Sequence, residues 1–146
     1  MALEEERNSR DSLYGRLLAV AERIESMALF FAKEKRETTA ARLMQQFADR
    51  PYSTWRIIET SLTPYKARIN AKTPGLLNGY IELMDEIFNR FETYEFVQEK
   101  DSRLSGEFLL SYHCQRKWLN EHKRKHGHWV LKLVEDEENQ EIESEE

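Results

Sequence analysis

The sequence predicts an all-α protein, a single-domain bundle of about five helices with a disordered acidic tail at its C-terminus. Apolar residues recur at steps of three and four along most of the chain, which is the period of one buried helix face. No segment alternates apolar and polar residues as a half-buried strand does, and five glycines and three prolines in 146 residues leave little room for loops. We expect a flexible N-terminus over residues 1–8, the bundle over residues 9–134 and the acidic tail over residues 135–146.

The first two expected helices each follow a side chain that can cap them. Ser9 or Asp11 suits the start of the first, which runs to about residue 33, and Thr38 suits the start of the second, over about residues 39–49. The second ends before Pro51, because the residue preceding a proline is pushed away from helical dihedral angles. The apolar faces consist of Leu13, Leu17, Val20, Ile24, Met27 and Phe31 in the first helix, and of Leu43, Met44 and Phe47 in the second.

The third expected helix begins at Ser53 and is interrupted by Pro64. Its apolar stripe continues past the proline, so Pro64 marks a kink or a restart, and Thr63 could cap the restarted piece. The stripe consists of Trp55, Ile58, Leu62, Tyr65 and Ile69. The same pairing of threonine and proline at Thr73 and Pro74 predicts the start of the fourth helix, which should run to about Glu95 or Val97. Its apolar positions are Leu77, Tyr80, Ile81, Met84, Ile87, Phe88 and Phe91.

The last expected helix is capped by Ser105 and ends near Gly127, since glycine commonly terminates helices. Phe108, Tyr112 and Leu119 lie on one of its faces. The short apolar segment over residues 129–134 is expected to pack on the bundle before the tail begins.

Two basic stretches are concealed by the net charge of −5. Residues 135–146 hold eight of the 27 acidic residues and none of the 22 basic ones, so the rest of the chain carries 22 − 19 = +3. Residues 50–72 and residues 116–125 each contain five Lys or Arg and one Glu, a local charge of +4. A run of like charge such as the tail is typically solvated and disordered; the alternative is that it mimics nucleic acid or docks on a basic partner.

The last helix carries the main candidate nucleic-acid site. On an ideal helix, His113, Lys117, Asn120 and Arg124 lie opposite the apolar face, with Arg116 and Lys123 at its flank. The strip rises roughly 16 Å at about 1.5 Å per residue, which is enough to follow a few phosphates of one strand. Such contacts do not depend on base sequence and weaken with salt. The alternative is an ordinary solvated helix face.

A second, weaker group of cations lies on the third segment and consists of Arg56, Lys66, Arg68 and Lys72. Arg56, Lys66 and Arg68 point in different directions on a straight helix, so only a bend at Pro64 could gather them. The fourth helix is acidic and should face water or a basic protein. Of the aromatic residues near the bases, Trp55 and Tyr65 fall on the apolar stripe, whereas Trp118 suits a partner interface or the core equally.

No catalytic or cofactor chemistry is expected. His122 and His126 have the spacing at which two helical imidazoles share a metal, with His128 nearby, but the surrounding Lys and Arg would repel a cation. Cys114 lies beside His113, and adjacent helical residues point about 100° apart, so burial of the thiol is expected. The chain has one cysteine, no signal peptide pattern and no apolar span, so we expect a cytoplasmic, soluble protein with no membrane partner.

Three segments of the chain resemble a known family. They are Leu13–Glu25, Gly106–Arg116 and, between them, Pro51–Trp55 with the helix that follows. Together they are similar to the carboxy-terminal helical domain of the large subunit of type I-C CRISPR effector complexes, over about residues 10–119. In that family the same region is also made separately, from an internal start, as the small subunit, and a chain that begins with Met1 just before this domain resembles that product.

The resemblance implies a non-catalytic helical bundle present in more than one copy. It would contact the large subunit, the backbone subunits and further copies of itself, and would support target DNA opened by the guide RNA, mainly its displaced strand. The loop around Phe47, Asp49 and Arg50 departs from the small residues of the family, and residues 123–128 and the tail lie beyond the matched region. A protein-binding scaffold without nucleic-acid contacts remains the alternative.

Overall fold

The computed structural model describes residues 9–132. The expected flexible N-terminus and the acidic tail over residues 135–146 lie outside these residues, so both stay predictions. The described elements, in chain order, are α2 (Arg10–Ala32), α3 (Thr39–Arg42), α4 (Met44–Asp49), α5 (Pro51–Ser61), α6 (Thr63–Lys72), α7 (Pro74–Arg90), the 3-10 turn η1 (Gln98–Lys100), α8 (Gly106–Glu121), β1 (His122–Lys125) and β2 (His128–Leu131). The predicted all-α class is confirmed, with one small hairpin added.

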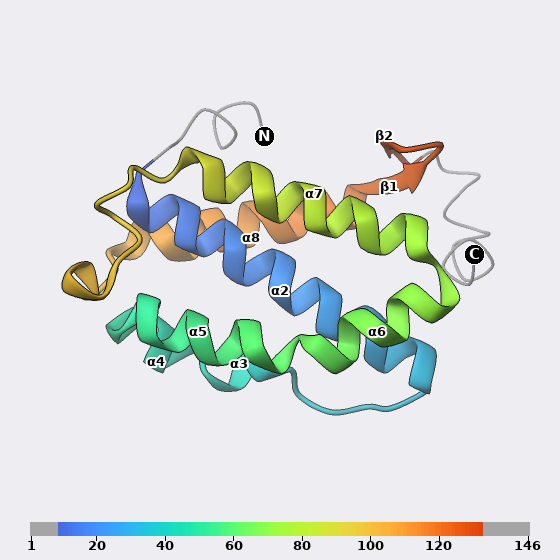
Figure 1. Ribbon diagram of the computed structural model, residues 1–146, viewed down its shortest axis with the longest axis horizontal. Helices are drawn as coiled ribbons and strands as arrows, with labels where there is room; N and C mark the ends of the chain where they lie inside the picture. Colours follow the sequence, from blue (N-terminus) through green and yellow to red (C-terminus); the bar gives the residue numbers. More distant parts are fainter. Residues whose placement is uncertain (1–8, 133–146) are drawn as a thin grey trace.

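Helix α2 is the central element of the bundle. Figure 1 shows it between α7 on one side and α5 and α6 on the other, with α8 behind it. Its most extensive packing is with α8, and Gly15 makes this close approach possible. A Cβ at position 15 would lie 2.2 Å from the carbonyl oxygen of Phe108, so only glycine lets the two backbones come so near. Trp55 and Phe47 are completely buried in the same core.

Three of the predicted caps are present. The hydroxyl groups of Ser9, Thr38 and Ser105 accept hydrogen bonds from backbone amides at the starts of α2, α3 and α8. The two threonine–proline starts differ from the prediction. Thr63 is the first residue of α6, and Thr73 occupies the cap position of α7 without a side-chain hydrogen bond to the helix. Because Pro64 and Pro74 have no amide hydrogen, each leaves one fewer unpaired backbone donor in the first turn of its helix.

Three predicted helix boundaries are corrected by the structure. The second helix is divided into α3 and α4 at Leu43, the third begins at Pro51 instead of Ser53, and α7 ends at Arg90, before the expected Glu95 or Val97. After α7 the backbone becomes extended at Phe91. The rings of Phe91 and Phe96 then pack 5.1 and 5.5 Å from the Tyr14 ring. Packing of these two partly buried rings against Tyr14 of α2 favours a loop over continued helix.

The end of the last helix was also wrongly predicted. Helix α8 ends at Glu121, and residues 122–131 form an antiparallel hairpin in which Lys125 pairs with His128. The two residues of its turn, His126 and Gly127, both have positive φ, which is the geometry of a two-residue type I′ turn. The strand pairing satisfies backbone groups that a longer α8 would have satisfied within itself.

Candidate nucleic-acid interface

The outer surface of α8 carries part of the predicted cationic strip. Its buried residues Phe108, Tyr112 and Leu119 face the bundle, so His113 and Lys117 are left exposed on the opposite side. His113 lies beside the Tyr112 ring, with centroids 5.1 Å apart. Lys117 is therefore the predicted cation on α8 that is most open to a ligand.

Arg116 is half exposed and already holds one ion pair. Its Nε lies 3.0 Å from Oε1 of Glu22 on α2, and its side chain is 48% exposed. The other oxygen of Glu22 accepts a hydrogen bond of 2.8 Å from the Tyr112 hydroxyl. Burial and this hydrogen bond raise the pKa of Tyr112, so the phenol remains a neutral donor. Arg116 thus keeps part of its guanidinium available while one side is bound to α2.

Arg124 is held inside the protein. Its guanidinium pairs with Glu82 of α7, lies 5.5 Å from the centroid of the Trp129 ring, and its side chain is only 11% exposed. Glycine at position 79 of α7 leaves room for this packing, because a Cβ there would lie 2.8 Å from Cδ of Arg124 and the side chain would have to shift. Arg124 therefore fastens the hairpin to α7, and the predicted helical strip through Lys117, Asn120 and Arg124 is corrected.

The hairpin presents other basic groups in place of Arg124. Lys125, His126 and His128 are exposed around the turn, and Lys123 is half-buried. Trp118 stacks on the His122 ring at a centroid distance of 4.1 Å, and lies 5.4 Å from Trp129. Of the two roles considered for Trp118, packing is the one seen here, because it supports the hairpin against α8.

The second predicted group is divided between two helices, each with its own local contacts. Arg56 on α5 donates to the Tyr52 hydroxyl at 3.1 Å. On α6, Arg68 donates to the carbonyl oxygen of Ala28 at 3.3 Å, the Lys72 ammonium lies 5.2 Å from the Phe31 ring centroid, and Lys66 is half-buried. Arg56 and Lys72 are exposed, whereas Arg68 is partly used in joining α6 to α2.

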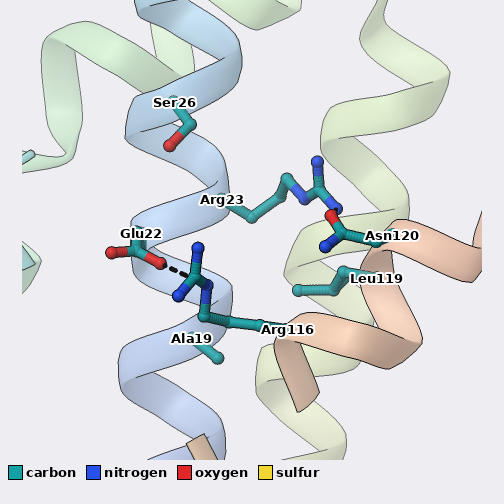
Figure 2. A pocket seen from close by; sticks show the side chains of 7 residues that line it. All are labelled: Ala19, Glu22, Arg23, Ser26, Arg116, Leu119 and Asn120. Atoms are coloured by element: carbon teal, nitrogen blue, oxygen red, sulfur yellow. Dashed lines mark hydrogen bonds and ion pairs between the residues drawn. The ribbon is translucent and has the colours of Figure 1, made fainter. Parts of the chain in front are cut away.

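A small pocket between α2 and α8 contains a cation that the sequence analysis missed, Arg23. The pocket has a volume of about 70 Å³, and Figure 2 shows Arg23 reaching from α2 towards Asn120 while Arg116 reaches from α8 towards Glu22. The lining residues are Ala19, Glu22, Arg23, Ser26, Arg116, Leu119 and Asn120. Arg23 could not be found from charge runs, because it lies on α2 far in sequence from the basic stretches.

The histidines considered as metal ligands do not have the helical spacing that the sequence suggested. His122 begins β1, and its Nδ1 lies 2.8 Å from the carbonyl oxygen of Trp118, so the helical spacing with His126 does not exist. Over residues 9–132, no three His, Cys, Asp or Glu side chains are grouped as metal ligands, and no helix is both long and apolar enough to cross a membrane. Cys114 is half-buried, so its expected burial is only partial.

Comparison with known proteins relates the chain to one family. A search of curated proteins gives no match. The family model described as CRISPR-associated protein (Cas_Csd1) matches residues 1–120, which include every helix of the bundle except the last residue of α8. The match confirms the resemblance to a component of type I-C CRISPR effector complexes. The chain belongs to the Cas_Csd1 family of CRISPR-associated proteins.

Proposed function

We propose that this chain is the small subunit of a type I-C CRISPR effector complex and acts without catalysis. In this role it bridges the large subunit and the backbone subunits in the cytoplasm, contacts further copies of itself, and holds the displaced strand of target DNA. Base sequence is read by the guide RNA, so a subunit of this kind needs only to contact the backbone.

The observation that supports DNA binding is a set of exposed basic groups on adjoining elements. Lys117 and half-exposed Arg116 lie on α8, and Lys125 lies on the hairpin that directly follows it. Figure 1 shows the hairpin continuing from the end of α8 at one end of the bundle. Cations arranged in this way can follow the phosphates of one strand and release their counterions.

The remaining predicted residues take different parts in the proposal. His113 and Lys123 flank the main contacts, and Arg124 acts indirectly because it fastens the hairpin. Arg56, Lys66 and Lys72 form a separate second contact along α5 and α6, and Arg68 supports it. No metal or other cofactor enters the proposal.

Charge reversal of exposed lysines in the assembled complex tests this function. We expect Lys117→Glu combined with Lys125→Glu to weaken binding of target DNA. The plot of the logarithm of the association constant against the logarithm of salt concentration has a negative slope. Its magnitude should decrease by about 0.7 for each lost contact to a single strand. A matched control is Lys35→Glu combined with Arg42→Glu, which changes charge equally at exposed residues outside α8 and the hairpin. Equal binding by both double variants would contradict the proposal.

A protein-binding scaffold is the second candidate function. It is favoured by Leu109 and Leu110, which are 43% and 49% exposed on α8, and by the exposed acids Glu82, Asp85 and Glu86 of α7. A photoreactive displaced strand in the assembled complex separates the two functions. DNA binding predicts cross-links to α8 or the hairpin, whereas a scaffold predicts that both remain unlabelled.

A further inference from the structure

The pocket between α2 and α8 is rich in hydrogen-bond donors. Arg23, Arg116, Ser26 and Asn120 all contribute groups that can donate, and each guanidinium has five N–H bonds in a planar fork. Arg23 uses Nη2 to donate to Oδ1 of Asn120, and Arg116 uses Nε towards Glu22. Each arginine therefore keeps further N–H groups beside the pocket.

The charges of the pocket do not cancel. Two guanidiniums are opposed by one carboxylate, that of Glu22, which leaves a surplus of one positive charge. Glu22 is also shared, because its Oε2 accepts from the Tyr112 hydroxyl at 2.8 Å and from the Thr38 hydroxyl at 3.4 Å. The ion pair of Glu22 with Arg116 is thus formed through one carboxylate oxygen, Oε1. An anion that enters the pocket would meet both arginines with Glu22 as its competitor.

The size of the pocket suits a small anion. One water molecule needs roughly 10–15 Å³ of such space, so about 70 Å³ is enough to admit a small oxyanion such as a phosphate group. Paired guanidiniums match the oxygens of a phosphate group well, since they can form two parallel hydrogen bonds. Lys117 follows Arg116 on α8 but does not line the pocket, and it is exposed.

We propose that this pocket binds one backbone phosphate of a single DNA strand, with Arg23 and Arg116 as its ligands and Glu22 as the internal competitor that limits its affinity. The proposal rests on the proposed function, because it assigns a place on the protein to one contact with the displaced strand. It adds Arg23, Ser26 and Asn120 to the interface.

Three substitutions in the assembled complex test the pocket, each measured by binding of target DNA over a range of salt. Arg23→Gln should weaken binding about tenfold at low salt, the effect of about one charge-assisted hydrogen bond, and lower the salt slope by about 0.7. Asn120→Asp should weaken it as well, since the carboxylate can still accept from Arg23 but adds negative charge to the pocket. Glu22→Gln should have the opposite effect and strengthen binding, because Arg116 loses its competitor.

Arg42→Gln is the matched control, with the same loss of charge outside the pocket, and thermal unfolding of each variant shows that it is folded. The phosphate site is refuted if all three variants bind DNA as tightly as the control variant does, while the variant with Lys117→Glu and Lys125→Glu still binds more weakly. The proposed function then survives. If the double lysine variant has no effect either, both proposals fail. Changed recovery of the other subunits with unchanged DNA binding would mean that the pocket holds an acidic protein side chain, which also refutes the phosphate site.

Discussion

Two buried tyrosines, Tyr14 and Tyr112, differ in whether the hydroxyl group makes a hydrogen bond. The ring of Tyr14 is fully buried between aromatic neighbours, among them Phe47 at a centroid distance of 5.8 Å. Within residues 9–132 its hydroxyl has no hydrogen-bond partner, whereas the Tyr112 hydroxyl donates to Glu22. A buried hydroxyl without a partner loses its hydration and gains nothing in return.

We therefore expect Tyr14→Phe to raise the free energy of unfolding by about 1 kcal/mol, because the substitution removes an unsatisfied group and keeps the ring. Tyr112→Phe is the control and should lower it by about 1.5 kcal/mol, since it removes a hydrogen bond to a charged acceptor. Urea denaturation measures both. If Tyr14→Phe were as destabilising as Tyr112→Phe, the Tyr14 hydroxyl would have to possess a partner.

Asp11 contributes a pH-dependent part of the stability. Its Oδ2 accepts from the amide of Ser105 at 2.7 Å, which joins the first turn of α2 to the start of α8. Burial acts to raise the pKa of Asp11, but the hydrogen bonds from Ser105 and the charge of Arg10 outweigh it, so the pKa is lowered in the folded protein. A carboxylate with a lowered pKa stabilises the fold above its unfolded pKa of about 3.9, and this stabilisation is lost as the pH falls through the folded value.

For Asp11→Asn we expect lower stability than the native chain at pH near 7 and a difference that shrinks in acid, from roughly pH 4 downward. Denaturation in urea at a series of pH values measures this difference. A constant difference at every pH would show that the charge of Asp11 is not involved.

Among the elements, the pair α2 and α8 depends most on one residue. Gly15 faces the backbone of α8, and atoms of that backbone cannot move aside as a flexible side chain could. Gly75, near the start of α7, has open space where a Cβ would lie. The two glycines therefore offer a matched comparison of packing with helix propensity.

We expect Gly15→Ala to destabilise the protein by about 3 kcal/mol, because a methyl group would force the two helices apart. Gly75→Ala should be neutral or stabilising by about 0.5–1 kcal/mol, as alanine favours helix. Thermal or urea unfolding measures both. Equal effects of the two substitutions would refute the close approach of α2 and α8.

The hairpin contacts α7 at Gly79 through two side chains, those of Arg124 and Trp129. An alanine at position 79 would lie against Arg124 and the Trp129 ring, so we expect Gly79→Ala to displace the hairpin and leave the bundle folded. Hydrogen exchange should then become faster at the amides of β1 and β2 while those of α2 stay protected. Gly106→Ala, where no atom lies within 4 Å, is the control. Unchanged exchange in the hairpin would contradict the proposed fastening.

For the whole molecule, the acidic tail reverses the sign of the net charge. Without residues 135–146 the chain changes from −5 to 22 − 19 = +3. The basic surface of α8 and the hairpin should attract DNA, and the negative charge of the tail should weaken this long-range attraction.

We expect removal of residues 135–146 to strengthen DNA binding by the assembled complex at low salt. The difference should vanish near 1 M salt, where charges are screened within about 3 Å. Replacement of the eight acids by Gln or Asn keeps the length of the tail and should have the same effect. If only the shortened chain bound more tightly, the charge of the tail would not be the cause.

The candidate site was predictable only in part. Lys117 and His113 were correctly expected on the exposed side of α8, because Phe108, Tyr112 and Leu119 define its buried side by helical period alone. Arg124 was placed on the same face, but its environment depends on Glu82, which is distant in sequence. Arg23 was missed for the same reason, since its role depends on Asn120 across the bundle.

The sequence by itself determined the helices and most of their starts, since apolar period, capping side chains and proline act within a few residues of the chain. Whether α8 continued past Glu121, and which cations stayed open to solvent, was decided only by the tertiary structure. The hairpin exists where it does because Trp129 and Arg124 pack on α7 around Gly79. Arg116 is half exposed on α8, whereas Arg124 is largely covered because it packs against the Trp129 ring and α7, a contact that only folding creates.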